Sequence, residues 1–232
     1  MLNGKFVSAV ICAAGASSRM GMDKSKQLLE LDGKAVIEHT VAAFENDGVT
    51  DEIVIVCPET LLKAFEELFS SHCTKVIRFA KGGAERQFSV FNGVSSCDES
   101  AQLVIIHDGA RPFVTPELIE SVAADGDSFG CATLAVPVKD TIKRVVNGIA
   151  AETPKRDELY AIQTPQVFRK DLYLCAYAHA AKDGIVCTDD CSLVELIGCA
   201  VKITPGDYNN IKITTPEDIA IAQAIADKKG DA

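Results

Sequence analysis

The sequence of 232 residues contains no apolar run that approaches the roughly 18 to 20 residues needed to span a bilayer. Its amino terminus lacks the pattern of a secretory signal and leads directly into an apolar run. Positive charge is scarce, because 23 Lys and Arg residues accompany 33 Asp and Glu residues, for a formal net charge of −10. This balance argues against binding to nucleic acid or to acidic membrane surfaces, but it leaves room for a local basic pocket. We therefore expect a cytoplasmic protein without nucleic-acid or membrane partners.

Two common nucleotide-binding motifs are also missing. The sequence contains no G-x-x-x-x-G-K-[ST] of a Walker A loop and no G-x-G-x-x-G fingerprint of a dinucleotide-binding fold. The second absence disfavours a dinucleotide-binding oxidoreductase.

Cysteine, in contrast, is plentiful. The nine cysteines are odd in number, and Cys12, Cys57 and Cys131 lie inside apolar runs. This usage favours reduced, buried thiols over a disulfide framework. Cys187 and Cys191, with His179 upstream, match no standard zinc-site spacing, so we expect no zinc site there.

Strand-like and helix-like runs alternate through the first 136 residues. The expected strands are 7–12, 53–57, 76–79, 103–107 and 131–136, and the expected helices are 35–46, 61–69, 86–95 and 116–124. This alternation predicts an α/β fold, with a Rossmann-like, doubly wound and mainly parallel sheet that binds ligands beyond the carboxyl ends of its strands. Gly15, Gly82, Gly83 and Asp108 each follow an expected strand, so they should meet at one edge of the sheet.

Residues 139–156 interrupt this alternation. Segments 141–146 and 149–153 flank Asn147-Gly148, the strongest short signal for a β-hairpin. A hairpin inserted into an α/β domain is either a lid or an arm that packs on another subunit, and we favour an arm at about residues 138–158. Helices are expected at 170–181 and 189–197, strands at 200–204 and 211–213, and a last helix after Thr215-Pro216-Glu217-Asp218. Because no linker or repeat is present, residues 1–232 are expected to form one domain that carries the arm.

The loop after the first strand, Cys12-Ala13-Ala14-Gly15, consists of small residues and is followed by Arg19 and Lys26. Small residues let the backbone approach a ligand closely, and successive N–H groups can hold phosphate oxygens. The two cations would add positive charge where phosphates gather. The loop favours a nucleoside triphosphate site, although an ordinary strand-to-helix turn with two surface cations has the same composition.

Asp108 ends an apolar run and is followed by Gly109 and, three positions on, by Arg111. A carboxylate there is well placed to hold Mg²⁺, which accepts one or two carboxylates together with phosphates and water. A turn aspartate paired with Arg111 explains the pattern equally well. We interpret His107 as a packing residue rather than a base, because a phosphate oxygen nucleophile is already anionic.

Three further segments are polar and adjoin expected elements. Gly82-Gly83 precedes a helix on which the Ser89 hydroxyl can face a ligand. Thr164-Pro165-Gln166 and residues 209–212 are expected to be loops beside strands. Each of these signals is weak by itself.

Taken in order, these segments resemble one family. They are Cys12-Ala13-Ala14-Gly15-x-x-x-Arg19-Met20, Lys26-Gln27, Gly82-Gly83-x-x-Arg86-x-x-Ser89-Val90, His107-Asp108-x-Ala110-Arg111-Pro112, Asp140-Thr141-x-Lys143, Thr164-Pro165-Gln166 and Asn210-Ile211-Lys212. The set is similar to that of the 2-C-methyl-D-erythritol 4-phosphate cytidylyltransferases, which catalyse the CTP-using step of the non-mevalonate isoprenoid route. The resemblance extends from about residue 7 to residue 217. Cys12 stands where family members often carry proline or alanine, and Ala84 where an acidic residue can occur. Both positions would act mainly through the backbone.

The resemblance implies a nucleotidyltransferase in which a sugar-phosphate oxygen attacks the α-phosphorus of CTP and pyrophosphate leaves. It implies Arg19, Lys26 and Lys212 as the catalytic cations, with Mg²⁺ or another divalent cation near Asp108. The implied CTP contacts are Ala13, Ala14, Gly15, Gly83, Ser89 and Asp108. The implied contacts to the sugar-alcohol phosphate are Arg111, Thr141, Arg156, Thr164 and Thr188.

Thr141 and Arg156 lie on the expected hairpin. The resemblance therefore implies a homodimer in which each arm completes the neighbouring site. Ribitol-5-phosphate cytidylyltransferases share almost every motif and are the alternative for the substrate. A nucleotide-binding protein that has lost catalysis is another alternative, which the joint presence of Arg19, Lys26, Asp108 and Lys212 disfavours.

Overall fold

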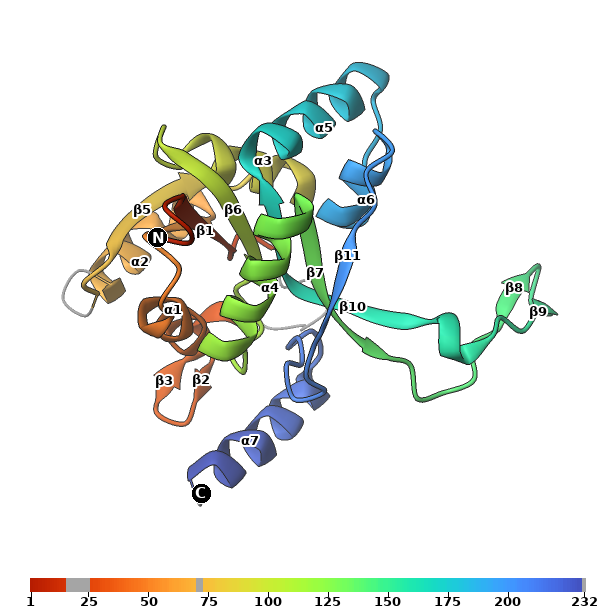
Figure 1. Ribbon diagram of the computed structural model, residues 1–232. Coiled ribbons are helices and arrows are strands. Elements are labelled where there is room, and N and C mark those ends of the chain that lie inside the picture. The colour runs from red at the N-terminus through yellow and green to blue at the C-terminus, as the bar shows by residue number, and fades with distance from the viewer. Residues whose placement is uncertain (16–25, 70–72, 231–232) are drawn as a thin grey trace.

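The centre of the molecule is a seven-stranded sheet with the strand order β11-β7-β10-β6-β1-β4-β5 (Figure 1). The computed structural model describes residues 1–15, 26–69 and 73–230. The strands are β1 (Phe6–Cys12), β4 (Glu52–Cys57), β5 (Val76–Lys81), β6 (Ala101–Asp108), β7 (Cys131–Pro137), β10 (Tyr160–Arg169) and β11 (Lys202–Pro205). Neighbouring strands pair in parallel, except that β10 runs antiparallel to both β6 and β7. The predicted mainly parallel sheet is confirmed.

Helices cover both faces of this sheet. They are α1 (Val36–Asn46), α2 (Leu62–Phe69), α3 (Arg86–Ser95), α4 (Pro116–Phe129), α5 (Lys170–Asp183) and α6 (Asp190–Glu195). A last helix, α7 (Pro216–Gly230), lies apart from the sheet and packs in a small core of its own (Figure 1). In β1, Val7 and Ile11 pack in a core with α1, α2 and α4, whereas Val10 packs in a second core with α3, α5 and α6. Successive residues of a strand point to opposite faces, so a strand between two helical layers must be apolar throughout. This requirement explains the uninterrupted apolar runs that made β1, β4 and β6 predictable.

Helix α4 extends to Phe129, five residues beyond the predicted end. Its start agrees with the prediction, since the Thr115 side chain accepts a hydrogen bond from the Leu118 N–H at 3.4 Å and Pro116 is the first helical residue. Gly126 lies inside the helix because a Cβ at that position would come within 2.4 Å of Val167 Cγ1 on β10. The glycine therefore permits close packing of α4 on the sheet and does not end the helix. The end comes at Gly130, which has a φ of +89°.

Two predictions near the carboxyl half were wrong. Thr164-Pro165-Gln166 is not a loop but lies in β10, where the pairing with β7 shifts register between Ile162 and Gln166 and the Thr164–Pro165 peptide is cis. Proline has no N–H for a ladder and is rare in central strands, which is why the sequence did not indicate this strand. The predicted strand at 211–213 is irregular chain, and the Ile213 N–H donates to the Ala110 carbonyl oxygen at 2.8 Å.

The predicted hairpin is present as β8 (Arg144–Val146) and β9 (Ile149–Glu152), which form a two-stranded sheet of their own. Asn147 and Gly148 have φ values of +50° and +79°, as a two-residue hairpin turn requires. The hairpin projects from the body of the molecule (Figure 1). Val145, Val146 and Ile149 are exposed on it.

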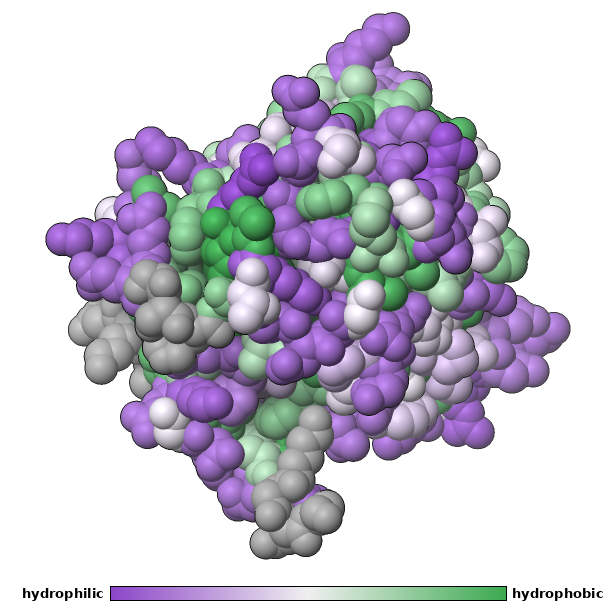
Figure 2. Space-filling view, turned by 60° about the vertical axis from the view of Figure 1, so that its left-hand side comes forward, coloured by the Kyte–Doolittle hydropathy of each residue, from purple (hydrophilic) through white to green (hydrophobic). Residues whose placement is uncertain are grey.

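Smaller elements complete the chain. They are the 3-10 helices η2 (Lys26–Leu28), η3 (Glu59–Leu61) and η4 (Arg156–Glu158) and the short strands β2 (Glu30–Leu31) and β3 (Lys34–Ala35). On the face drawn in Figure 2, hydrophilic residues dominate, and hydrophobic residues form separate patches among them. Among the described residues, we find no helix with the length and apolar character of a membrane span.

Candidate active site

The carboxyl ends of β1 and β6 and the start of α3 enclose a pocket of about 360 Å³. Its lining includes Ala14, Gly15, Gly83, Ser89, Asp108 and Lys212, together with Cys12, Gln27, Ala84, Glu85, Arg86 and Ala110. The predicted meeting of the glycine loops with Asp108 at one edge of the sheet is therefore confirmed. Ala13 does not belong to this lining; its side chain is buried in the core and its N–H donates to the Val56 carbonyl oxygen at 2.7 Å.

Gly82 allows its loop to lie against the loop after β1, and Gly83 allows the same loop to lie against α3. A Cβ on Gly82 would lie 2.4 Å from Ala14 Cβ, and a Cβ on Gly83 would lie 2.5 Å from Phe88 Cβ. The Gly83 N–H donates to Ser89 Oγ at 2.9 Å, and the Ser89 hydroxyl donates to the Glu85 carbonyl oxygen at 3.1 Å. Ser89 thus fixes the loop between β5 and α3 at the wall of this pocket.

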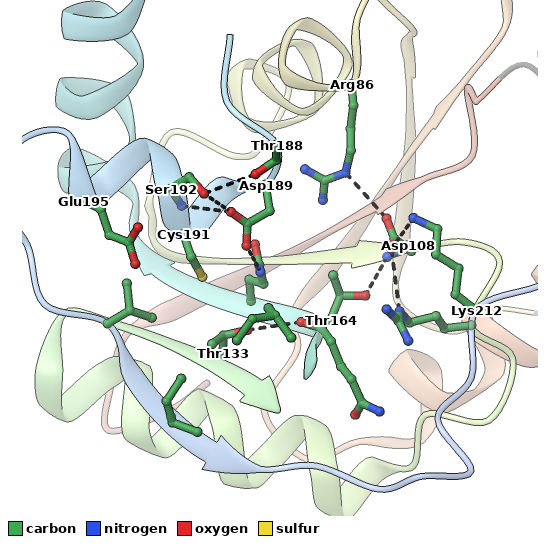
Figure 3. Close-up of a pocket in the computed structure, with 16 residues that line it drawn as sticks. Arg86, Asp108, Thr133, Thr164, Thr188, Asp189, Cys191, Ser192, Glu195 and Lys212 are labelled. Atoms are coloured by element: carbon green, nitrogen blue, oxygen red, sulfur yellow. Dashed lines mark hydrogen bonds and ion pairs between the residues drawn. The ribbon is translucent and has the colours of Figure 1, made fainter. Parts of the chain in front are cut away.

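Asp108 stands among three cations (Figure 3). Its Oδ2 lies 2.8 Å from Lys212 Nζ and 3.6 Å from Arg111 Nε, and its Oδ1 lies 3.6 Å from Arg86 Nε. Burial by itself would raise the pKa of Asp108, but Lys212, Arg86 and Arg111 hold that pKa well below its usual range. Asp108 is therefore an ionised carboxylate within an excess of positive charge, in a protein whose net charge is negative.

His107 is buried against the ring of Phe44. The Asp108 N–H donates to Thr164 Oγ1 at 3.0 Å, Thr164 Oγ1 lies 3.1 Å from His107 Nδ1, and His107 Nε2 lies 3.3 Å from the Arg111 carbonyl oxygen. A neutral ring with its proton on Nε2 satisfies every contact, because Nε2 then donates and Nδ1 accepts. Burial lowers the pKa of His107 to about 3, so this neutral form persists at physiological pH. The placement supports the interpretation of His107 as a packing residue.

A second pocket of about 550 Å³ adjoins the first. Its lining includes Arg111, Thr164 and Thr188, all predicted to hold the sugar phosphate. Thr164 and Thr188 are labelled in Figure 3. Arg86, Asp108 and Lys212 line both pockets. These three charged side chains therefore form a wall between the two pockets, and a ligand in either pocket would lie beside it.

Some predicted site residues are not brought to these pockets. Thr141 and Arg156 are exposed on the arm side of the chain, and Arg156 Nη1 donates to the Lys139 carbonyl oxygen at 3.3 Å. Neither residue belongs to the lining of the two pockets. Arg19 and the side chain of Lys26 lie outside the described residues.

Several site residues were not predicted. Arg86 was noted only as part of the Gly82-Gly83 motif, yet its Nη1 lies 2.7 Å from Oδ2 of the buried Asp190 while its Nε faces Asp108. Asn210 is buried, donates from Nδ2 to the Thr164 carbonyl oxygen at 2.9 Å, and accepts from Arg111 Nη1 on its own carbonyl oxygen at 2.7 Å. The position of Arg86 at the start of a helix after two glycines is a usable signal. Asn210 was noted only as part of the Asn210-Ile211-Lys212 segment, and nothing in that segment indicates its contacts with Thr164 and Arg111.

The donor set around Asp108 fits a metal ion shared with substrate. Oδ1 of Asp108 lies 3.6 Å from Arg86 Nε, which is beyond hydrogen-bond distance, and no side chain of the described residues donates a hydrogen bond to it, so within this part of the chain the oxygen is available as a ligand. Mg²⁺ commonly takes one carboxylate with substrate phosphates and water. Over residues 1–15, 26–69 and 73–230, no three His, Cys, Asp or Glu side chains are grouped as a metal cage would require. All nine cysteines are free thiols.

The mainly parallel sheet, the glycine loops and the cationic pocket at its edge define an α/β fold of the nucleotidyltransferase type. The family model of 2-C-methyl-D-erythritol 4-phosphate cytidylyltransferase matches residues 7–228. The chain belongs to the 2-C-methyl-D-erythritol 4-phosphate cytidylyltransferase family.

Individual relatives agree with this assignment. The chain is 45% identical over 218 residues to the 2-C-methyl-D-erythritol 4-phosphate cytidylyltransferase of Geobacillus thermodenitrificans, covering 94% of this chain and 95% of the relative. It is 43% identical over 226 residues to the enzyme of the same name from Caldanaerobacter subterraneus, covering 94% and 97%. These names do not favour the ribitol alternative.

Solved structures extend the likeness to the fold. A crystal structure of 4-diphosphocytidyl-2C-methyl-D-erythritol synthase from Anaerococcus prevotii has a TM-score of 0.88 at 33% identity and covers 97% of this chain and 100% of its own. The 2-C-methyl-D-erythritol 4-phosphate cytidylyltransferase of Thermus thermophilus has a TM-score of 0.78 at 30% identity, with 96% and 99% covered. The predicted resemblance is confirmed.

Proposed function

We propose that this protein transfers a CMP group from CTP to 2-C-methyl-D-erythritol 4-phosphate and releases pyrophosphate, as a step of isoprenoid biosynthesis. The observation that carries the proposal is the wall of Arg86, Asp108 and Lys212 shared by two adjoining pockets. Two polyanions must meet in this reaction, so fixed positive charge at their meeting point lowers the barrier. CTP would occupy the pocket with the glycine loops, and the acceptor the pocket with Thr164 and Thr188.

In the proposed reaction, an oxygen of the acceptor phosphate attacks the α-phosphorus of CTP. The new P–O bond forms while the bond from the α-phosphorus to the β-bridging oxygen breaks, and pyrophosphate leaves with that electron pair. Lys212 would stabilise the charge that gathers at the α-phosphorus, and Arg111 would hold the acceptor phosphate. The attacking oxygen is already anionic, so no base is required, which is consistent with the low pKa of about 3 at His107.

The remaining catalytic assignments are carried over from the family resemblance. Arg19 and Lys26 would brace the triphosphate from the loop after β1. Asp108 would hold Mg²⁺ or another divalent cation, which when bound would neutralise phosphate charge. The open Oδ1 of Asp108 supports this role.

We propose a homodimer in which the hairpin arm of one protomer completes the site of the other. Support comes from the exposed apolar side chains of Val145, Val146 and Ile149, whose exposed fractions are 57%, 48% and 73%. Monomeric proteins seldom expose such a group on a projecting element. Thr141 and Arg156 lie on this arm and line neither pocket of their own chain, as an intersubunit role requires.

We also propose that residues 1–232 form one domain with this arm at about 138–158, and that the protein is cytoplasmic. The single seven-stranded sheet supports the first statement. Nine free thiols support the second, because reducing compartments keep cysteines unpaired.

The decisive test is a pyrophosphate-release assay with CTP and Mg²⁺, in which 2-C-methyl-D-erythritol 4-phosphate and ribitol 5-phosphate are compared as acceptors. We expect release with the methylerythritol acceptor at a kcat/KM at least about 100-fold above that with ribitol, because acceptor hydrogen bonds discriminate strongly. Preference for ribitol 5-phosphate would contradict the proposed substrate. Absence of release with both acceptors would contradict the proposed activity.

A further inference from the structure

The segment between α5 and α6 carries Thr188, yet it has no regular secondary structure from Ile185 to Asp189. Thr188 lines the pocket assigned to the acceptor. A threonine on irregular chain can contribute to binding only if other groups fix its backbone, because an unrestrained loop costs conformational entropy when it is ordered. The groups that hold this segment therefore determine the position of Thr188.

Gln87, in the first turn of α3, holds the segment directly before Thr188. Its side chain is buried, with an exposed fraction of 5%. Gln87 Oε1 accepts a hydrogen bond from the Cys187 N–H at 2.8 Å, and Gln87 Nε2 donates to the Ile185 carbonyl oxygen at 3.2 Å. One amide thus satisfies a donor and an acceptor of the same irregular stretch.

The neighbouring residue of α3 holds the other side of Thr188. Arg86 Nη1 donates to Asp190 Oδ2 at 2.7 Å, and the Asp190 side chain is 2% exposed. Removing one partner of such a buried pair leaves an uncompensated charge, so the contact resists separation. Gln87 and Arg86, two consecutive residues of α3, therefore bind the chain before and after Thr188, respectively.

Gln166 of β10 completes the restraint from the opposite side. Its Oε1 accepts from the Asp190 N–H at 3.2 Å, and its Nε2 donates to Asp189 Oδ2 at 2.8 Å. Asp189 in turn caps α6 by accepting from the Ser192 N–H at 2.9 Å. The segment 185–189, called the acceptor loop below, is thus held by side chains from both β10, which carries Thr164, and the first turn of α3.

Helix α3 also belongs to the nucleotide pocket. It starts directly after the Gly83-Ala84-Glu85 loop, and Ser89, one turn into the helix, binds the Gly83 N–H. The same turn of helix therefore touches the nucleotide pocket through Ser89 and holds the acceptor loop through Gln87. Gln87 itself lines neither pocket.

We propose that Gln87 is a positioning residue that sets Thr188, and with it the acceptor phosphate, relative to the nucleotide pocket. The inference rests on the proposed assignment of the two pockets to acceptor and nucleotide. If Gln87 has this role, loss of its side-chain amide should lower kcat/KM for the acceptor and leave the KM for CTP nearly unchanged.

Steady-state kinetics of Gln87→Met test this asymmetry, because methionine keeps the length and volume of the side chain while removing both hydrogen bonds. We expect kcat/KM for the acceptor to fall about 10- to 100-fold and the KM for CTP to stay within about 2-fold. Gln102→Met is the matched control, since Gln102 is an exposed glutamine on β6, and wild-type kinetics are expected. Equal changes in both substrates, or none, would overturn the proposal.

A double-mutant cycle with Thr188→Ala asks whether Gln87 acts through Thr188. If it does, Gln87→Met combined with Thr188→Ala loses no more than about 2-fold beyond Thr188→Ala alone. Fully multiplicative losses would show an independent, merely structural role and would overturn the proposal. Turnover by the wild-type protein is the separate test of the proposed function.

Amide hydrogen exchange on the wild-type protein gives a readout that does not depend on how a variant folds. The Cys187 N–H should exchange at least about 100-fold more slowly than an unprotected amide, because it donates to a buried acceptor. Exchange of Cys187 at the unprotected rate would overturn the proposal.

Discussion

Lys212 Nζ lies 2.8 Å from Oδ2 of Asp108, although Asp108 ends the central strand β6 and Lys212 follows the edge strand β11. The contact exists because the irregular chain before α7 returns to the centre of the sheet. The Ile213 N–H donates to the Ala110 carbonyl oxygen at 2.8 Å, and Arg111 donates to the Asn210 carbonyl oxygen at 2.7 Å. These bonds place the Lys212 ammonium in the wall between the two pockets.

Replacing Lys212 by methionine removes this charge and keeps most of the side-chain volume. We expect kcat to fall by about 10² to 10³, the scale for losing one preorganised donor, and Lys212→Arg to recover part of the loss. Lys63→Met is the matched control, because Lys63 is exposed on α2 and lines neither pocket. A kcat within about 3-fold of wild type for Lys212→Met would contradict the assigned role.

The buried ring of His107 predicts a pH dependence of stability. Its pKa is about 3 in the folded protein, below the ordinary value of 6.5, so between these values the unfolded chain binds more protons. Above pH 6.5, His107 therefore does not reduce the free energy of unfolding. As the pH falls from 6.5 towards 3, the free energy of unfolding decreases by up to about 1.4 kcal/mol per pH unit.

Urea unfolding of wild type and His107→Gln between pH 4.5 and 8 measures this dependence. The free-energy difference between the two proteins should shrink as the pH falls below 6.5. His179→Gln, which removes an exposed histidine of α5, should reproduce the wild-type curve. A difference between wild type and His107→Gln that does not vary with pH would refute a neutral buried ring.

Gly82 is required for the contact between the two loops of the nucleotide pocket. In Gly82→Ala the new Cβ would lie 2.4 Å from Ala14 Cβ, so the loops must separate. We expect the KM for CTP to rise at least about 10-fold with little change in the KM for the acceptor. Gly48→Ala is the control, because its Cβ would meet only the flexible Glu120 carboxylate at 3.2 Å. An unchanged KM for CTP would show that this contact does not shape the site.

The arm predicts a specific effect of Arg156. Arg156→Ala should raise the KM for the sugar phosphate at least about 10-fold while leaving the KM for CTP within about 2-fold. Lys155→Ala removes the adjacent exposed cation and should behave as wild type. Equal effects of Arg156→Ala on both substrates would count against the role.

Mixing Arg156→Ala with Lys212→Met tests whether the arm serves the neighbouring subunit. Random exchange into dimers pairs an intact arm with an intact body at about one quarter of the sites, so activity should return towards that level. No recovery on mixing would place the arm in its own protomer's site.

The physical basis of each signal explains how much could be predicted. Strands β1, β4 and β6 are buried on both faces and therefore appear as apolar runs. Gly15 follows β1 and Asp108 ends β6, so their meeting at one edge of the sheet was predictable. β10 was missed because Pro165 interrupts it at the point where its pairing with β7 shifts register. Ile213 was assigned to a strand on its apolar pattern, but it packs in the small core beneath α7.

Residues that act through tertiary contacts could not be found in the same way. Asn210 matters because folding brings it to Thr164 and Arg111, and Gln87 because folding brings it to Cys187. Neither contact leaves a local pattern in the sequence, because each joins segments far apart in the chain.

The proposed reaction joins CTP and a methylerythritol phosphate, each bound in its own pocket, at the wall that the two pockets share. Mass spectrometry of the nucleotide product, after incubation with CTP, 2-C-methyl-D-erythritol 4-phosphate and Mg²⁺, tests it most directly. The proposed reaction yields 4-diphosphocytidyl-2-C-methyl-D-erythritol in amounts equal to the pyrophosphate released. Free CMP as the nucleotide product, or CTP left unchanged, would contradict it.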